Sequence, residues 1–195
     1  MGEGPLTLGA LMRQALKLHP DCRCPAVTRI EAGVARLRAG GLTLVWVVTG
    51  DIGDLALPPM TSPTRADGLW RHTCFEGFVR AAPGEAYFEL NFAPSTQWAA
   101  YGFSGYRAGM RALGEIAPPR IEVRRTASLF DLRVSLDLDR LAGLPDDAAW
   151  RAGLSAVIEE TNGRKSYWAL AHPPGGADFH HAEGFALGLP PPEPS

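Results

Sequence analysis

Hydrophobic and polar residues alternate in short runs along most of the chain, and turn residues separate the runs. Residues 42–49 (LTLVWVVT) are dense in β-branched and aromatic side chains, as in a buried central strand. Residues 130–138 carry an apolar side chain at every second position, which indicates a strand with one buried face. The pattern predicts an all-β protein: an antiparallel β-sandwich of the jelly-roll type with at most short helices.

The same reasoning predicts the other strands. We expect residues 27–37 to pair with 42–49 as a hairpin, and Asn162-Gly163 to form a type I′ turn between two later strands. Further strands are predicted over residues 70–80, 87–92, 121–125, 154–160, 166–172 and 185–189.

Less regular segments complete this prediction. Residues 51–67 are rich in Pro, Gly and Asp and should form a surface loop, and residues 145–150 should form one short helical turn. Residues 6–18 fit either an amphipathic helix or the start of the first strand. We expect one domain over residues 1–189, followed by a disordered, Pro-rich tail over residues 190–195.

Composition narrows the class of protein. Of the 195 residues, 46% are hydrophobic and 21% are charged, and the formal net charge is −2, so we expect no nucleic-acid partner. No apolar run approaches the roughly 20 residues of a membrane helix, so we expect no membrane partner either. The apolar residues 6–12 have no basic residue in front of them, unlike a secretory signal. We therefore expect a cytoplasmic protein, and its oligomeric state is left open.

Cysteine usage fits a reducing compartment. The chain has three cysteines, Cys22, Cys24 and Cys74, and Cys22-Arg-Cys24 is one residue shorter than a Cys-x-x-Cys clasp. Free thiols are the favoured interpretation. A metal cluster of Cys22, Cys24 and His19 is the alternative.

Common catalytic motifs are absent from the sequence. Gly102-Phe-Ser-Gly105 is one residue short of a nucleophile elbow, and no glycine-rich phosphate loop precedes a helical pattern. The five histidines, none four residues from another, are His19, His72, His172, His180 and His181. The sequence therefore predicts a protein that is not an enzyme.

Three carboxylates, Glu76, Glu89 and Glu159, fall within predicted strands beside large apolar residues. A buried carboxylate needs a partner, so each is expected to be hydrogen-bonded inside the sandwich, solvated, or used in a site. If the strands of Glu76 and Glu89 are neighbours, the two acids could share a face with Arg71, Arg80 or Arg107, or bind a cation. A hydrolase that uses Glu76 or Glu89 is the least favoured alternative.

Several aromatic residues stand beside polar ones rather than inside purely apolar runs: Trp70, Trp98, Tyr101, Phe103, Tyr106 and Trp168. A sugar ring offers C–H groups on its face and hydroxyls on its edge, so its site needs a flat aromatic platform flanked by hydrogen-bonding groups. Core packing is the competing explanation for these rings.

The chain resembles the bacterial DOMON-like domains, which are related to the family-nine carbohydrate-binding modules. Residues 69–78 (LWRHTCFEGF), 87–95 (YFELNFAPS) and 98–101 (WAAY) resemble the central strands of that superfamily. Later segments also fit, over residues 155–160, 166–172 and 177–185, and the resemblance spans about residues 15–189. Where the family carries an acidic pair before the glutamate, this chain has Thr73-Cys74.

The resemblance implies a sandwich that binds a small molecule, either a sugar or haem, without transforming it; we favour the sugar and expect no cofactor. In sugar-binding relatives, aromatic rings stack on a terminal saccharide, and Trp70, Trp98 and Trp168 match that role. The full set of expected ligand-binding residues is Trp70, Glu76, Asn91, Trp98, Arg107, Glu159 and Trp168. In haem-binding relatives, one Met and one His ligate the iron of haem b; here the candidates are Met60 or Met110 with His172 or His180.

Overall fold

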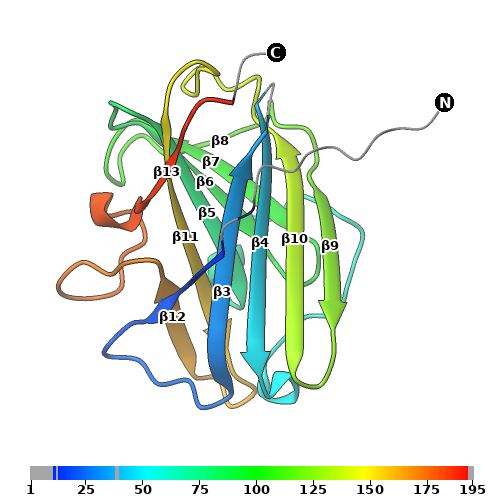
Figure 1. Cartoon of the computed structure of the whole chain (residues 1–195). Helices are drawn as coiled ribbons and strands as arrows, with labels where there is room; N and C mark the ends of the chain where they lie inside the picture. The colour runs from blue at the N-terminus through cyan, green and yellow to red at the C-terminus, as the bar shows by residue number, and fades with distance from the viewer. Residues whose placement is uncertain (1–10, 12, 38–39, 193–195) are drawn as a thin grey trace.

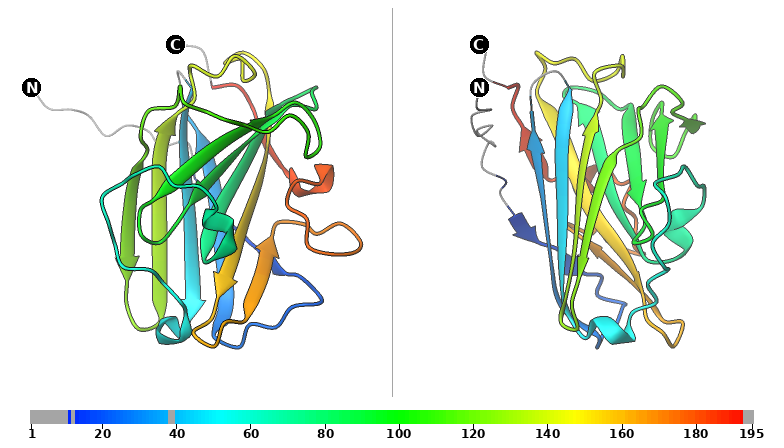
Figure 2. Two further views of the ribbon diagram at one scale, coloured as in Figure 1. Left: turned by 180° about the vertical axis from the view of Figure 1, so that it is seen from behind. Right: turned by 90° about the vertical axis from the view of Figure 1, so that its right-hand side faces the viewer.

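The computed structural model describes residues 11, 13–37 and 40–192, which form two antiparallel sheets packed face to face (Figures 1 and 2). The smaller sheet has the order β1-β3-β4-β10-β9, with bounds β1 Arg13–Ala15, β3 Val27–Arg36, β4 Gly41–Gly50, β10 Leu129–Asp137 and β9 Arg120–Arg125. The larger sheet has the order β2-β12-β11-β5-β6-β7-β8, with β13 paired to β11. Its strands are β2 Lys17–Leu18, β12 Lys165–Ala169, β11 Trp150–Glu159, β5 Cys74–Ala81, β6 Tyr87–Phe92, β7 Trp98–Phe103, β8 Arg111–Ala112 and β13 Leu187–Leu189.

Helical structure within these described ranges is confined to three single 3-10 turns: η1 Ile52–Asp54, η2 Leu69–Arg71 and η3 Ala182–Gly184. No described helix is long and apolar enough to cross a membrane. The predicted all-β sandwich with at most short helices is confirmed.

The sheets share one hydrophobic core, and Trp46 of β4 connects them. Its fully buried ring lies 5.8 Å from Phe75 and 6.1 Å from Phe92, which belong to the larger sheet. The indole Nε1 donates a hydrogen bond to the carbonyl of Ser155 on β11 at 3.1 Å. Because this bond satisfies the indole N–H, Trp46 fills the core without leaving a buried donor unpaired.

The predicted hairpin of residues 27–37 and 42–49 is confirmed by the antiparallel pairing of β3 with β4. β11 and β12 also form a hairpin, but its turn is not type I′. Glu160 N donates to the Arg164 carbonyl and Gly163 N to the Glu160 carbonyl, while Gly163 has φ of 84° and Asn162 is not in the positive-φ region. A type I′ turn needs positive φ at both central residues, so this loop is instead a type I turn followed by a left-handed glycine.

The described part of residues 6–18 contains the strands β1 and β2, so of the two alternatives the strand holds there; residues 6–10 and 12 lie outside the described residues. Two other local expectations are corrected. Residues 145–150 form a non-helical turn in which Ala148 N donates to the Pro145 carbonyl, because Trp150 already begins β11. Trp70 lies in η2, ahead of β5, rather than in the strand predicted over residues 70–80.

The predicted tail begins where the last strand ends. Residues 190–192 have no regular secondary structure, and residues 193–195 lie outside the described residues, so the predicted disorder of 190–195 stays a prediction.

Candidate functional site

The outer face of the larger sheet carries a second apolar cluster, separate from the core between the sheets. Alternate residues of β5, β6 and β7 face outward because the side-chain period of a strand is two. The cluster consists of Phe78, Tyr87, Ala99, Tyr101, Phe103 and Phe185, with Leu69 and Phe179 packed against it. In the rear view of Figure 2 (left), η2 lies in front of this sheet. This face is therefore covered by loops rather than open to solvent.

A pocket of about 390 Å³ opens between this sheet face and the loops. We call it the Glu76 pocket; it is lined by Trp70, Glu76, Glu89, Phe103, Arg107, Met110, Val157, Tyr167, Ala177, Phe179 and His180. The sheet contributes side chains from β5, β6, β7, β11 and β12, and the loops contribute the remainder. Its walls are mainly aromatic, and two carboxyl groups lie on its sheet side.

Glu76 is the central polar group of this pocket. It stands opposite Asn91 on β6 and opposite Ser155 on β11, so the three residues form one row across three strands. All three are buried, and Glu76 Oε1, Asn91 Oδ1 and Ser155 Oγ have no hydrogen-bond partner within the described residues. Buried polar groups in native proteins are nearly always hydrogen-bonded. Of the three, Glu76 lines the pocket, so its unpartnered oxygen is a place where a ligand or water is expected to bind.

Glu89 is the second carboxyl group of the pocket. Its Oε1 accepts a hydrogen bond from Asn91 Nδ2 at 2.7 Å, and its side chain is buried like that of Glu76. Burial, followed by the charge of Glu89, raises the pKa of Glu76 well above its ordinary value. Burial also raises the pKa of Glu89, although the hydrogen bond from Asn91 and the charge of Arg107 oppose that shift. The pair can therefore both donate and accept hydrogen bonds when Glu76 is protonated.

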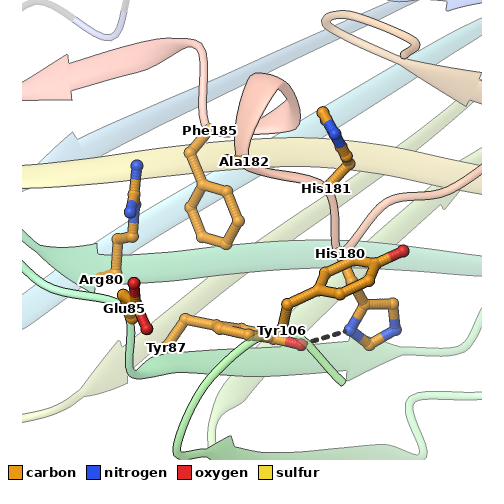
Figure 3. A pocket seen from close by; sticks show the side chains of 8 residues that line it. All are labelled: Arg80, Glu85, Tyr87, Tyr106, His180, His181, Ala182 and Phe185. Carbon is orange, nitrogen blue, oxygen red and sulfur yellow. Dashed lines mark hydrogen bonds between the residues drawn. The ribbon is translucent and has the colours of Figure 1, made fainter. Parts of the chain in front are cut away.

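His180 forms one wall of the pocket and is held by Tyr87. Tyr87 Oη accepts the backbone N–H of Arg107 at 3.2 Å and lies 2.7 Å from His180 Nδ1 (Figure 3). Burial lowers the pKa of His180 to about 4, so the ring is neutral at pH 7. The other ring nitrogen, Nε2, lies 3.8 Å from Glu89 Oε2.

A second pocket lies on the other side of His180. Figure 3 shows this pocket of about 450 Å³, which is lined by Arg80, Glu85, Tyr87, Tyr106, His180, His181, Ala182 and Phe185. Because His180 lines both pockets, its ring is a shared wall between them.

Asp178 fastens two of the covering loops together. Its carboxylate accepts hydrogen bonds from Arg107 Nη2 at 2.8 Å and from the Tyr106 hydroxyl, both in the segment between β7 and β8. It also accepts the backbone N–H of His180 at 3.1 Å. These bonds fix Arg107 and His180 on adjacent edges of the Glu76 pocket.

The structure brings together four of the seven residues expected from sequence: Trp70, Glu76, Asn91 and Arg107. Trp70, Glu76 and Arg107 line the pocket, and Asn91 lies beside them through its bond to Glu89. The Trp70 ring is 37% exposed and meets Tyr101 edge to face at 5.8 Å. Trp70 is therefore partly exposed at the pocket.

The expectation that Trp98 and Trp168 share this face is wrong. Both side chains belong to the core between the sheets and are about 5% exposed. Trp98 is opposite Phe92, which contacts Trp46, and Trp168 is opposite core Ala156. The strand period of two places each of them on the side of the sheet away from the Glu76 pocket.

Glu159 also lies outside the Glu76 pocket. Its Oε2 is 2.7 Å from His72 Nδ1, and both residues line another pocket, of about 660 Å³, beside η2. Glu159 therefore has a nearby partner of its own, unlike Glu76.

Sequence reasoning left several lining residues out of the ligand set, and Tyr167 is the instructive one. It is opposite Val157 on β11 and packs 6.1 Å from Phe179 in the covering loop. Tyr167 and Trp168 are adjacent, so choosing the tryptophan selected the opposite face of β12. Which residues of β12 share a face with Glu76 depends on the strand order β12-β11-β5-β6, and the sequence alone does not give that order.

The haem alternative is not supported by the ligands present. Of the four candidates, Met110 and His180 line the Glu76 pocket, whereas Met60 and His172 do not. An axial histidine needs a free nitrogen directed at the iron. His180 Nδ1 is hydrogen-bonded to Tyr87 at 2.7 Å and Nε2 lies 3.8 Å from Glu89 Oε2, so an iron at either nitrogen would have to displace one of these neighbours. The arrangement of His180 therefore does not favour an axial haem ligand.

Cys22, Cys24 and Cys74 are all free thiols. Over residues 11, 13–37 and 40–192, no three His, Cys, Asp or Glu side chains converge as metal ligands. His19, the third member of the alternative cluster, instead contacts the Gly175 carbonyl through Nε2 at 3.0 Å.

No protein-family model and no curated protein matches the chain. Solved structures do resemble it. A provisionally assigned carbohydrate-binding protein of Bacteroides uniformis ATCC 8492 has a TM-score of 0.65 at 10% identity, over 89% of this chain and 84% of that chain. A family 9 carbohydrate-binding module of Caldicellulosiruptor kristjanssonii, solved with cellotriose, has a TM-score of 0.50 at 8% identity, over 86% of this chain and 76% of that chain. The chain therefore has a fold similar to that of carbohydrate-binding modules.

Proposed function

We propose that the chain binds a saccharide in the Glu76 pocket. The observation that carries this proposal is Glu76 Oε1, a buried carboxyl oxygen on the pocket lining without a partner among the described residues. A sugar hydroxyl supplies the missing hydrogen bond, because it is both a donor and an acceptor. The unpartnered oxygens of Asn91 and Ser155 on the flanking strands extend the same polar row.

The aromatic walls support a sugar rather than a purely polar ligand. Trp70, Phe103, Tyr167 and Phe179 line the same pocket as the two glutamates. Flat apolar walls above carboxyl groups match a ring that has C–H groups on its faces and hydroxyls on its edge. The volume of about 390 Å³ lies in the range of small-molecule sites.

In this proposal the chain is a binding module with no reaction and no cofactor of its own. The similarity of its fold to carbohydrate-binding structures supports that assignment. Membership of the DOMON-like domains, the cytoplasmic location and the absence of nucleic-acid and membrane partners stay predictions.

Isothermal titration calorimetry of the full chain with glucose, amino sugars and cello-oligosaccharides tests the proposal. We expect saturable heat for at least one sugar at millimolar concentration, and its loss in Glu76→Ala. The matched control is Glu85→Ala, an exposed residue that lines only the neighbouring pocket. Absence of heat for every sugar would overturn the proposal.

A second candidate is hydrolysis of a glycosidic bond, because Glu76 and Glu89 place two carboxyl groups in one pocket. Glu76, whose pKa is raised well above its ordinary value, would be the acid and Glu89 the nucleophile or base. Release of nitrophenol from nitrophenyl glycosides, abolished by Glu76→Gln, would favour hydrolysis. Recovery of intact oligosaccharide after incubation favours binding alone.

A further inference from the structure

Glu76 has an unusual electrostatic position for a buried carboxyl group. It is 4% exposed, it lines the pocket, and Oε1 has no partner in the part of the chain that the structure describes. No Lys, Arg or His side chain in those described ranges forms an ion pair with it. A buried carboxylate normally has a cation or several hydrogen-bond donors beside it. Glu76 has neither.

The other groups facing Glu76 do not supply a positive charge to its carboxylate. The thiol of Cys74 on β5, the carboxyl of Glu89 on β6 and the phenol of Tyr167 on β12 are neutral or negative. His180, from the covering loop, is neutral at pH 7 because its pKa is lowered to about 4. The remaining group is Arg107.

Arg107 is already committed to another carboxylate. Its Nη2 donates to Asp178 Oδ1 at 2.8 Å, and its side chain is 52% exposed. Its charge lowers the pKa of Glu89, whereas burial and the charge of Glu89 raise the pKa of Glu76. The two pocket carboxyls therefore lack a matching pair of protein cations.

Aromatic rings enclose the same space. Trp70, Phe103, Tyr167 and Phe179 line the same pocket as the carboxyl groups, and Trp70 is the most exposed of the five tryptophans. The face of an aromatic ring attracts cations, most strongly when water is excluded. Carboxyl groups below and aromatic faces around them are the two features that favour an ammonium group over a neutral hydroxyl.

We propose that the sugar bound in the Glu76 pocket carries a free amine, bound as an ammonium group between Glu76 and Glu89. This inference rests on the proposed saccharide site and narrows its ligand to an amino sugar. Protonated Glu76 loses its proton to solvent as the ammonium takes its place beside the carboxylate, so binding releases a proton. A neutral sugar releases none, because it binds to Glu76 in its protonated form.

Calorimetry at pH 6 with glucosamine, N-acetylglucosamine, glucose and methylamine tests this inference. We expect glucosamine to bind at least tenfold more tightly than glucose and N-acetylglucosamine, because neither of these carries an ammonium group. Methylamine, which has the charge without the ring, should bind at least tenfold more weakly than glucosamine. Titrations in buffers of different ionisation enthalpy should show proton release for glucosamine only.

The matched variants are Glu76→Gln and Glu85→Gln. Glu76→Gln should abolish the preference for glucosamine over glucose and its proton release; near-ultraviolet circular dichroism checks that it is folded. Glu85→Gln, at an exposed position in the neighbouring pocket, should keep both. Equal binding of glucose and glucosamine would overturn this inference and leave the saccharide site standing. Binding of methylamine as tight as that of glucosamine would also overturn it, and no binding of any sugar would overturn the saccharide site itself.

Discussion

Glu76 and Asn91 lie directly opposite each other on β5 and β6, and each keeps a buried oxygen without a partner among the described residues. An unpaired buried polar atom costs about 1–3 kcal/mol, which a fold does not retain without compensation elsewhere. A ligand that bonds to Glu76, which lines the pocket, supplies part of that compensation. The pair is thus a source of instability in the free protein and of affinity in the complex.

Glu76→Gln should stabilise the free protein at neutral pH. The folded-state pKa of Glu76 is raised above its ordinary value of 4.5, so its contribution to stability is fully present below that value and is lost as pH rises through the folded pKa. We expect the variant to melt above the wild type at pH 8 and the gap to close towards pH 4. In a chain of this size each kcal/mol of unfolding free energy shifts the melting temperature by roughly 2–4 °C.

Thermal melts of both proteins between pH 4 and pH 8 measure this gap. Exposed Glu85→Gln is the control and should show no pH-dependent difference from the wild type. A Glu76→Gln variant that melts below the wild type at pH 8 would contradict the assignment of Glu76 as a destabilised carboxyl group.

His180 should have the opposite pH dependence. Its pKa is lowered from 6.5 to about 4, so its stabilising effect is present above pH 6.5 and is lost as pH falls towards 4. A lowering of the pKa by this amount corresponds to on the order of 3 kcal/mol of unfolding free energy. We expect His180→Gln to lose less unfolding free energy than the wild type between pH 7 and pH 4.5, measured by urea denaturation. Parallel curves for the wild type and His180→Gln would show that His180 titrates normally and is not a buried neutral wall.

Substitutions of Trp70 and Trp168 should distinguish a residue that contacts the ligand from one that packs in the core. Trp70→Ala should reduce sugar affinity at least tenfold with a stability change below about 1 kcal/mol, because its ring lies at the pocket and is 37% exposed. Trp168→Phe should lower stability by about 1–3 kcal/mol and leave sugar affinity unchanged, because it lies in the core. Calorimetry and chemical denaturation of both variants measure these effects. A loss of affinity in Trp168→Phe alone would contradict the assigned site.

Asp178→Asn should weaken binding by loosening the covering loops. The variant loses the ion pair with Arg107 and the charge that accepts from Tyr106. We expect a several-fold loss of sugar affinity. The free energy of unfolding should fall by less than about 1 kcal/mol, because the Arg107 side chain is half exposed. The control Glu115→Gln breaks a similarly exposed ion pair with Arg111 outside the pocket and should bind normally. Equal affinity of Asp178→Asn and the wild type would exclude this positioning role.

Strand alternation explains how much of the site could be predicted. Alternation along the predicted strand 87–92 sets Glu89 and Asn91 on one face and Phe88, Leu90 and Phe92 on the other, and the latter three lie in the core. Alternation alone does not say on which face of the sheet Trp168 lies. That depends on how β12 aligns with β11 and β5, which is set by contacts between residues far apart in sequence.

The loop residues of the pocket were harder still to predict. Phe179 and His180 lie in a segment between β12 and β13 that has no hydrophobic period. Their positions follow from the bonds of Asp178 to Arg107 and of Tyr87 to His180, which join residues about 70–90 positions apart. Trp70 was misplaced for a related reason: its apolar character suggested a strand, whereas Gly68 with φ of 74° precedes a 3-10 turn there.

The most direct test of the central claim is a nuclear magnetic resonance titration of the protein labelled with ¹³C at its methionine methyl groups. Met110 lines the Glu76 pocket, whereas Met60 lies outside it and is 63% exposed. We predict that a binding sugar shifts the Met110 methyl signal saturably and leaves that of Met60 in place. A Met110 signal that stays unmoved while calorimetry reports binding, or a shift of Met60 alone, would contradict a saccharide site at Glu76.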